Sequence, residues 1–198
     1  MDHGEQSAAP ELAGLLQAAG SGDPAAWRAI VDRYSRRVYA LAQSRCRDAD
    51  VSEEITQSVL ATVALKVGAG SYAEVGRFES WLFRVAMNRI RDHVRRSRRS
   101  LVVGHGGELL DRQEAKGHVG ADGATLDRLR WAVGQLNEQD REIIELRHHG
   151  DLTFKQMADM LEEPVGTLLA RHHRALKKLK ELIEASDARA KGSGEVER

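Results

Sequence analysis

Cysteine, proline and aromatic residues are scarce in this chain, and each scarcity excludes a class of protein. The 198 residues include one Cys, three Pro, three Trp, three Tyr and three Phe. A lone thiol, Cys46, can form neither an internal disulfide nor a cysteine metal cluster, so the chain suits a reducing compartment. We expect Cys46 to be a half-buried apolar side chain. So few aromatic residues and prolines favour helices over a β-sandwich or barrel.

Targeting segments are also missing. No apolar run approaches the length of a membrane span. The N-terminus carries several acids and no Lys or Arg before Arg28, which is the wrong charge for a secretory signal. We therefore expect a cytoplasmic protein with no membrane insertion.

Signatures of catalysis and of metal binding are absent from the sequence. There is no glycine-rich phosphate loop after a strand, no GxSxG elbow, and no base suited to Cys46. His148, His149, His172 and His173 form two pairs, but neighbours on a helix point about 100° apart, so each pair offers one ligand at most. The sequence thus predicts no catalytic residue, no cofactor and no metal site.

Helical periodicity organises the first half of the chain. Residues 1–22 are predicted to be a flexible acidic leader with one weak helix at 10–19. Asp23 is a typical N-cap, and apolar residues then recur every three or four positions. A second helix is expected after Ser52 as its cap, and a third from about Glu79. These three helices predict a domain over residues 23–100.

The second half predicts another helical domain. Residues 101–123 contain six glycines and no sustained period, so 101–124 is expected to be a flexible linker. Periodic segments resume over 125–185, and residues 186–198 are expected to be a polar tail. The predicted fold class is all-α, with two small domains on either side of the linker.

The third predicted helix carries an unusual concentration of arginine. The chain has 30 basic and 30 acidic residues, yet residues 84–99 hold seven arginines against one acid, Asp92. Guanidinium groups spaced along one helix face suit the phosphates of nucleic acid. The predicted contacts, which lie near one line of this helix, are Arg84, Asn88, Arg91 and Arg95.

Four aromatic residues lie beside these arginines: Tyr72, Phe78, Trp81 and Phe83. Aromatic faces can stack on unpaired bases, which would make the segment a single-strand site. Aromatic side chains are equally typical of a core. Both interpretations stay open from the sequence.

A second basic helix follows a pattern typical of a helix-turn-helix. Met157 and Leu161 are expected to point inward from its first helix, and Val165 and Leu168 from its second. From Arg171 to Lys180 there are five basic residues and no acid. Such a helix can enter a major groove, with polar groups on base edges and cations on phosphates. The predicted contacts are Thr167, Arg171, His173, Arg174, Lys177 and Lys178.

Four passages, taken in order, resemble a known family over about residues 23–185. They read RYSRRVYALA, SEEITQSVL, FESWLFRVAMNRIRDHVRR and LNEQDREIIELRHHGDLTFKQMADMLEEPVGTLLARHHRAL. Together they resemble the extracytoplasmic-function (ECF) sigma factors of the sigma-70 family of bacterial RNA polymerase.

The resemblance implies a function for each part of the chain. The first domain would be region two, in which Glu53, Glu54 and Gln57 face the polymerase core. Its arginine helix would hold the opened minus-ten element, with Asn88, Asp92, Arg95 and Arg96 at the matching positions. The second would be region four, with its recognition helix in the minus-thirty-five element. Joining them lets two weak contacts with promoter DNA act together. The resemblance also implies an anti-sigma factor as a further partner.

The chain departs from the family pattern at several positions. Ser58 stands where an acid is usual. At the helix-turn-helix break, Glu162 and Glu163 replace a glycine and an apolar residue, and a left-handed glutamate costs about 1 kcal/mol, so a reshaped turn is expected. Residues Leu169, Ala170 and His172 leave the groove-facing surface with fewer polar groups.

Two other functions fit the same features. A free-standing DNA-binding regulator would use the helix-turn-helix and treat the arginine helix as a phosphate clamp. An interaction adaptor would dock its basic helices on an acidic protein. Charge reversal at Arg95 and Arg96 separates these alternatives, because only a sigma factor would lose promoter opening while it retained the polymerase core.

Overall fold

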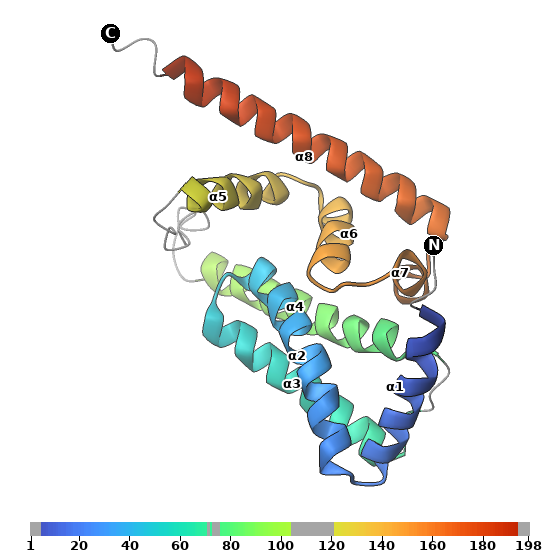
Figure 1. Ribbon diagram of the computed structural model, residues 1–198. Coiled ribbons are helices and arrows are strands. Elements are labelled where there is room, and N and C mark those ends of the chain that lie inside the picture. The colour runs from blue at the N-terminus through green and yellow to red at the C-terminus, as the bar shows by residue number, and fades with distance from the viewer. Residues whose placement is uncertain (1–4, 71, 73–75, 104–120, 194–198) are drawn as a thin grey trace.

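The computed structural model describes residues 5–70, 72, 76–103 and 121–193, and the regular structure of these residues is entirely helical (Figure 1). The helices are α1 (Glu5–Gly20), α2 (Pro24–Cys46), α3 (Ala49–Gly68), α4 (Phe78–Val103), α5 (Ala121–Gly134), α6 (Glu138–His148), α7 (Phe154–Leu161) and α8 (Val165–Ser193). None of these described helices has the length and apolar character needed to cross a membrane. The predicted all-α fold class is confirmed.

Helices α2, α3 and α4 form the first packed unit. As predicted, Asp23 caps α2, and its carboxylate accepts a hydrogen bond from the Ala25 N–H at 2.8 Å. The cap predicted for α3 was wrong: Asp48, not Ser52, accepts the bond from Val51. Ser52 lies inside the helix, where its hydroxyl donates to the Asp48 carbonyl. Both residue types can cap, and the one placed earlier begins the helix.

The leader was predicted to be flexible with one weak helix at 10–19, and its described residues form a longer helix, α1, which packs against α2 and α3. Leu16 and Ala19 are buried in the same core as the α2 and α3 stripes. Leu12, Leu15 and Leu16 recur at helical spacing, which gives α1 an apolar face that only tertiary contact can cover. The helix was predicted from the sequence, whereas its packing against α2 and α3 was not.

Helices α5 to α8 form the second unit. Ala132, Leu136 and Ile144 pack with Ala175 and Leu179 in a small core. A polar tail was predicted from residue 186, and helix α8 continues into it as far as Ser193. The linker prediction for 101–124 is only partly testable: α4 extends to 103, α5 begins at 121, and residues 104–120 lie outside the described residues.

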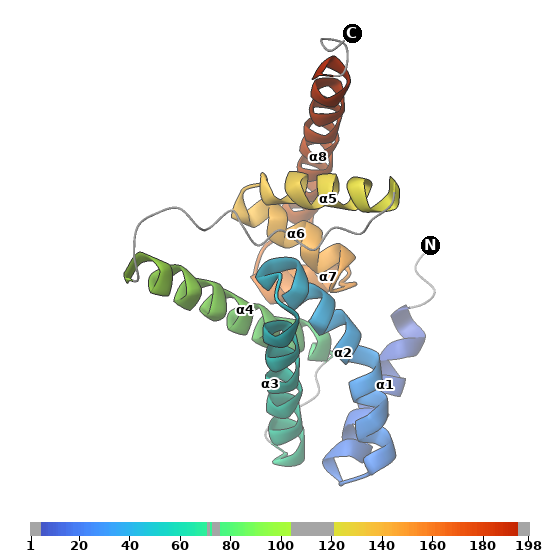
Figure 2. The ribbon, with the colours of Figure 1, turned by 90° about the vertical axis from the view of Figure 1, so that its left-hand side faces the viewer.

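The two units share a core. Helices α6 and α7 lie against α2 and α4, as Figures 1 and 2 show from two directions. Leu146, Leu152, Met157 and Met160 are buried in one cluster with the stripes of the first unit. Two domains were predicted on either side of a linker, and the structure adds an apolar interface between them.

Candidate nucleic-acid interface

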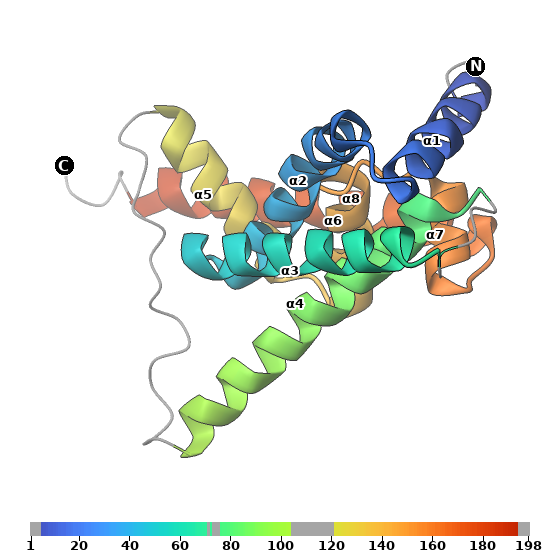
Figure 3. The ribbon, with the colours of Figure 1, turned by 90° about the horizontal axis from the view of Figure 1, so that it is seen from below.

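Helix α4 has two unlike halves. Up to Ile90 it carries a buried stripe that includes Leu82, Phe83 and Met87. Beyond Val94 the sequence supplies no further apolar residue at the same spacing until the end of the helix, so nothing draws this half onto the core. The C-terminal half therefore projects from the body as an arm (Figure 3).

The aromatic residues beside the arginines belong mainly to the core. Phe78 and Phe83 are buried, and the Phe78 ring lies 5.4 Å from the ring of Tyr34. Tyr72 and Trp81 are half-buried, and their ring centroids lie 4.9 Å apart with the planes inclined by 34°. Of the two interpretations of this cluster, core packing holds for both phenylalanines, because they fill the space between α2 and α4.

The predicted minus-ten residues divide into two groups along α4. Arg84 and Arg91 form one group, because both are bonded to the second unit. Arg84 donates to the carbonyls of Asp159 and Met160 at 2.8 and 2.7 Å. Arg91 forms an ion pair with Glu142. Each guanidinium therefore already has protein partners, although both side chains are 43% exposed.

The other predicted minus-ten residues lie on or near the arm. Asn88, Asp92, Arg95 and Arg96 are all exposed. Arg95 pairs with Asp92 of its own helix at 2.8 Å. Arg96, Arg98 and Arg99 are exposed, and among the described residues they have no ion-pair partner. In the described part of the arm, Arg96, Arg98 and Arg99 are thus free to bind phosphates. Arg95 can also bind one if its weak surface pair with Asp92 breaks.

The helix-turn-helix is formed by α7, a tight turn and α8. Thr153 and Gln156 make a capping box at the start of α7. Glu162 adopts the left-handed conformation with φ 59° and ψ 36°, so the turn keeps a shape that usually requires glycine. We expected the glutamate to reshape the turn, and that prediction was wrong.

Arg84 explains part of this outcome. Besides its bonds to the last carbonyls of α7, its guanidinium lies 3.3 Å from the Glu162 carboxylate. A cation at a helix C-terminus stabilises the partial negative charge there and satisfies carbonyls that lack helical partners. The strained turn is therefore supported from the first unit.

Most predicted minus-thirty-five residues are exposed on α8: Thr167, His173, Arg174, Lys177 and Lys178. Arg171 differs, because its side chain is only 15% exposed and pairs with Glu163 at 2.9 Å. Leu168 is buried as predicted, whereas Val165 was expected inward and is 39% exposed. Leu169 is exposed as well, so the start of α8 presents apolar and basic groups together.

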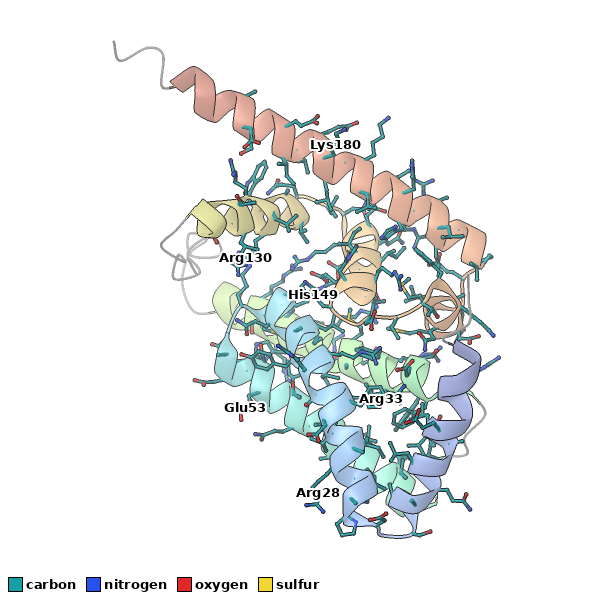
Figure 4. The ribbon with its side chains drawn as sticks, in the orientation of Figure 1. Arg28, Arg33, Glu53, Arg130, His149 and Lys180 are labelled. Atoms are coloured by element: carbon teal, nitrogen blue, oxygen red, sulfur yellow. The ribbon has the colours of Figure 1, made fainter. Side chains whose placement is uncertain are left out.

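The predicted polymerase-binding residues lie on the outer side of α3. Glu53, Glu54 and Gln57 are exposed, and the Gln57 amide donates to the Glu53 carboxylate at 3.1 Å. Figure 4 shows Glu53 directed away from the second unit. This surface is separate from both basic helices.

The histidine pairs meet between α6 and α8. The His148 and His172 rings stack with centroids 5.8 Å apart and planes inclined by 25°, and Phe154 lies edge-on to His172. Stacked rings direct their nitrogens outward in their own planes and not to a common point. Burial, then the proximity of His148 and Arg147, lowers the pKa of His172 below its ordinary value.

One group of residues escaped prediction: an ionic network between the units. Arg45, whose side chain is 6% exposed, pairs with Glu145 and Glu138 of α6. Arg141 bonds both Glu145, at 2.7 Å, and the Ser44 carbonyl, at 3.0 Å. Burial opposes the charge of Arg45, but the two glutamates outweigh it and raise its pKa above the ordinary value. The signal for the acidic side was the spacing of Glu138, Glu142 and Glu145 along one helix face.

Known proteins share both parts of this chain. The family model Sigma-70 region 2 matches residues 30–100, and Sigma-70, region 4 matches residues 132–181. The ECF RNA polymerase sigma factor SigK of Mycolicibacterium vanbaalenii is 30% identical over 177 residues, which cover 87% of this chain and 89% of the relative.

Solved structures show the same fold. CnrH, determined in complex with the cytosolic domain of CnrY, matches with a TM-score of 0.64 and 22% identity over 86% of this chain and 96% of its own. The sigma factor RpoE of Bartonella quintana, determined with the anti-sigma factor NepR, matches with a TM-score of 0.60 and 21% identity over 79% and 96%. With both regions present in order, the chain belongs to the ECF sigma factors of the sigma-70 family, which direct RNA polymerase to promoters.

Proposed function

We propose that this chain is a non-enzymatic initiation subunit that acts in the cytoplasm and divides promoter recognition between its two basic helices. The observation that carries the proposal is the pair of exposed cationic surfaces in one chain, the α4 arm and the outer face of α8. Phosphate contacts supply affinity and position the protein, whereas base contacts supply specificity.

The α4 arm is the proposed site for the opened minus-ten element. Arg95, Arg96 and their neighbours project into solvent from a rigid helix, so they can follow the backbone of a single strand without prior rearrangement. Asn88 offers both a donor and an acceptor for a base edge. Because Phe78 and Phe83 are core residues, base contacts in this proposal fall to polar side chains of α4 and to Trp81 and Tyr72.

Helix α8 is the proposed reader of the minus-thirty-five element. Thr167, Arg174 and Lys178 are exposed and lie close to one helix face, at spacings of seven and four residues. His173 and Lys177 flank that face. Arg171 is held by Glu163, so its proposed role is to position the start of α8, and contact with a phosphate would require that pair to break.

Two protein partners complete the proposal. The acidic surface of Glu53 and Glu54, with Gln57, is the proposed contact with the polymerase core, since it remains free while both basic helices hold DNA. An anti-sigma factor is the second proposed partner. CnrH and RpoE, which share this fold, were each solved with a partner protein bound.

Run-off transcription with core polymerase on fragmented genomic DNA tests the proposal. The wild-type chain should co-elute with the core and give discrete promoter-dependent transcripts. The double reversal of Arg95 and Arg96 to Glu should abolish opening and leave co-elution intact. Reversal of Arg130 to Glu is the matched control, because this exposed arginine of α5 lies outside the proposed sites and should not affect transcription. Absence of co-elution and of any specific transcript would refute the assignment.

A further inference from the structure

One arginine of α4 is directed away from the proposed DNA contacts and toward α3. Four residues at steps of four, three and four form one row along α4: Arg84, Asn88, Arg91 and Arg95. Arg89 lies outside that row, and its Nη2 donates a hydrogen bond to the Thr62 hydroxyl of α3 at 2.6 Å. This guanidinium therefore lies at the boundary between α3 and α4, which pack against each other.

Arg89 has no counter-charge in the part of the chain that the structure describes. Each arginine of the row has a carboxylate partner, whereas Arg89 has only the neutral hydroxyl of Thr62. That hydroxyl itself donates to the Ser58 carbonyl at 2.9 Å. The side chain of Arg89 is half-buried, and its Nε is buried without a hydrogen-bond partner.

This arrangement brings little benefit to the folded chain alone. A half-buried charge without a counter-ion and a buried donor without an acceptor both cost free energy. A methionine has a similar unbranched stem and would cover the same part of α3 without either cost. An arginine at position 89 is therefore better explained by an acceptor that a second molecule supplies.

The surface beside Arg89 is continuous with the proposed polymerase contact. Glu54, Ser58, Thr62 and Leu65 follow one another along α3 at steps of four, four and three, so they lie on one side of the helix. Glu54 is exposed, and Leu65 is 75% exposed although it is apolar. The distance from Glu54 to Thr62 along the helix is about 12 Å. This side of α3 thus combines an anion, the cation that α4 places against Thr62, and an exposed leucine.

We propose that Arg89 is a binding site for an acidic side chain of the polymerase core. The matching segment of the core carries a cation for Glu54, an acid about 12 Å away for Arg89, and an apolar side chain for Leu65. A guanidinium can bind a carboxylate through two parallel hydrogen bonds, which adds geometric specificity to the charge. Two opposite charges at a fixed separation also set the register of docking. This inference rests on the proposed role of α3 as the polymerase contact.

Nucleic acid is the other anion that an arginine of α4 could bind. Two observations favour a protein carboxylate at this position. The exposed Glu53 and Glu54 lie on the same helix as Thr62 and would repel a phosphate backbone. Arg89 is also outside the row that follows the arm. A partner segment with charges of both signs complements this mixed surface, and a polyanion does not.

Two properties of the full chain, its affinity for core polymerase and its melting temperature, test the proposal together. Arg89→Met removes the guanidinium, and Arg89→Lys retains the charge without the planar fork. Arg130→Met, at an exposed arginine of α5, is the matched control. Biolayer interferometry on immobilised core polymerase gives the dissociation constants at low and high salt. Anisotropy of a short fluorescein-labelled single strand gives strand binding.

Arg89→Met should melt no lower than wild type and should bind the core about tenfold more weakly, chiefly through faster dissociation. Its core binding should also depend less on salt, because the complex lacks one ion pair. Arg89→Lys should fall between Arg89→Met and wild type in affinity, and Arg130→Met should match wild type. A purely structural role predicts the opposite pattern, with a lower melting temperature and unchanged core binding.

Three outcomes would overturn the proposal. A melting temperature of Arg89→Met below that of wild type would make Arg89 a structural contact between α3 and α4. Core binding equal to wild type would show that no carboxylate meets it. Weaker strand binding with unchanged core binding would assign Arg89 to DNA.

Failure of this site and failure of the proposed function give different results. If the wild type binds the core and directs promoter-specific transcripts while Arg89→Met binds equally well, the carboxylate site is refuted and the sigma assignment stands. If the wild type itself does not bind the core, the proposed function is refuted, and the role of Arg89 with it.

Discussion

Replacing Glu162 by glycine should stabilise the protein, although it removes a charged contact. The residue sits in the helix-turn-helix at φ 59°, a conformation that costs a non-glycine residue about 1–2 kcal/mol. Glycine adopts it freely. Relief of this strain is the main favourable term in the substitution.

The opposing terms are smaller. The Glu162–Arg84 contact is 3.3 Å long, and its partners are 79% and 43% exposed, so it contributes about 0.2–1 kcal/mol after solvent screening. Arg84 keeps its bonds to the Asp159 and Met160 carbonyls. Glycine also has more conformational freedom in the unfolded chain, and this lowers the gain in stability by several tenths of a kcal/mol more. The net expectation is a gain of about 0.5 kcal/mol in the free energy of unfolding.

Urea denaturation followed by circular dichroism measures this gain. Glu162→Gln is the matched variant, since it loses the charge and keeps the left-handed backbone, and it should be slightly less stable than wild type. The ordering Gly above wild type above Gln is the prediction. If the glycine variant proved less stable than the glutamine variant, backbone strain at this turn would not be the controlling term.

Three further predictions concern single side chains. Arg45→Met should lower the free energy of unfolding by about 3 kcal/mol, because Glu145 stays buried with only Arg141 to pair with; a loss below about 1 kcal/mol in urea denaturation would contradict this. Burial, and then the nearby His148, lower the pKa of His172 in the folded protein below 6.5. As the pH falls through 6.5, this histidine therefore takes up a proton in the unfolded chain before it does so in the folded one. The stability that the neutral histidine contributes above that pH is therefore lost below it. His172→Phe should reduce the fall in melting temperature between pH 7.5 and 5.5. An unchanged slope would show that His172 does not cause this fall. Burial raises the pKa of Cys46 to about 11, so native alkylation by iodoacetamide at pH 8 should be far slower than in urea, and equal rates would refute the shielding.

Local signals predicted the helices well because each depends on a few neighbouring residues. The stripe of Ile55, Val59 and Val63 and the Asp23 cap needed nothing beyond their own spacing. Where two residues could serve as a cap, as with Asp48 and Ser52, composition alone could not choose between them. Whether α1 would pack onto the domain likewise depended on the surface of α2 and α3 that it contacts, and a sequence pattern does not show that surface.

The sequence predicted the solvent exposure of most candidate site residues but not their long-range ion pairs. Exposed cations such as Arg95 and Lys178 were identified from charge and helical spacing alone. Arg84 and Arg91 share that spacing with them, yet their partners come from more than fifty residues along the chain. Long-range ion pairs depend on how two units pack, and no local period encodes that. The acidic spacing on α6 was the available hint, because Glu142 and Glu145 had to find a counter-charge to be buried.

The zero net charge of the chain shapes how it must find DNA. With 30 basic and 30 acidic residues, the whole molecule exerts little long-range attraction on a polyanion, although α4 and α8 are locally cationic. Each helix alone can neutralise only a few phosphates, so either contact by itself should be weak and sensitive to salt. Specific binding therefore requires both at once, on a body that fixes their spacing. The α6 glutamates pair with Arg45 of α2 and Arg91 of α4, so part of the basic charge is balanced inside the folded chain, and the exposed end of α4 carries the remainder.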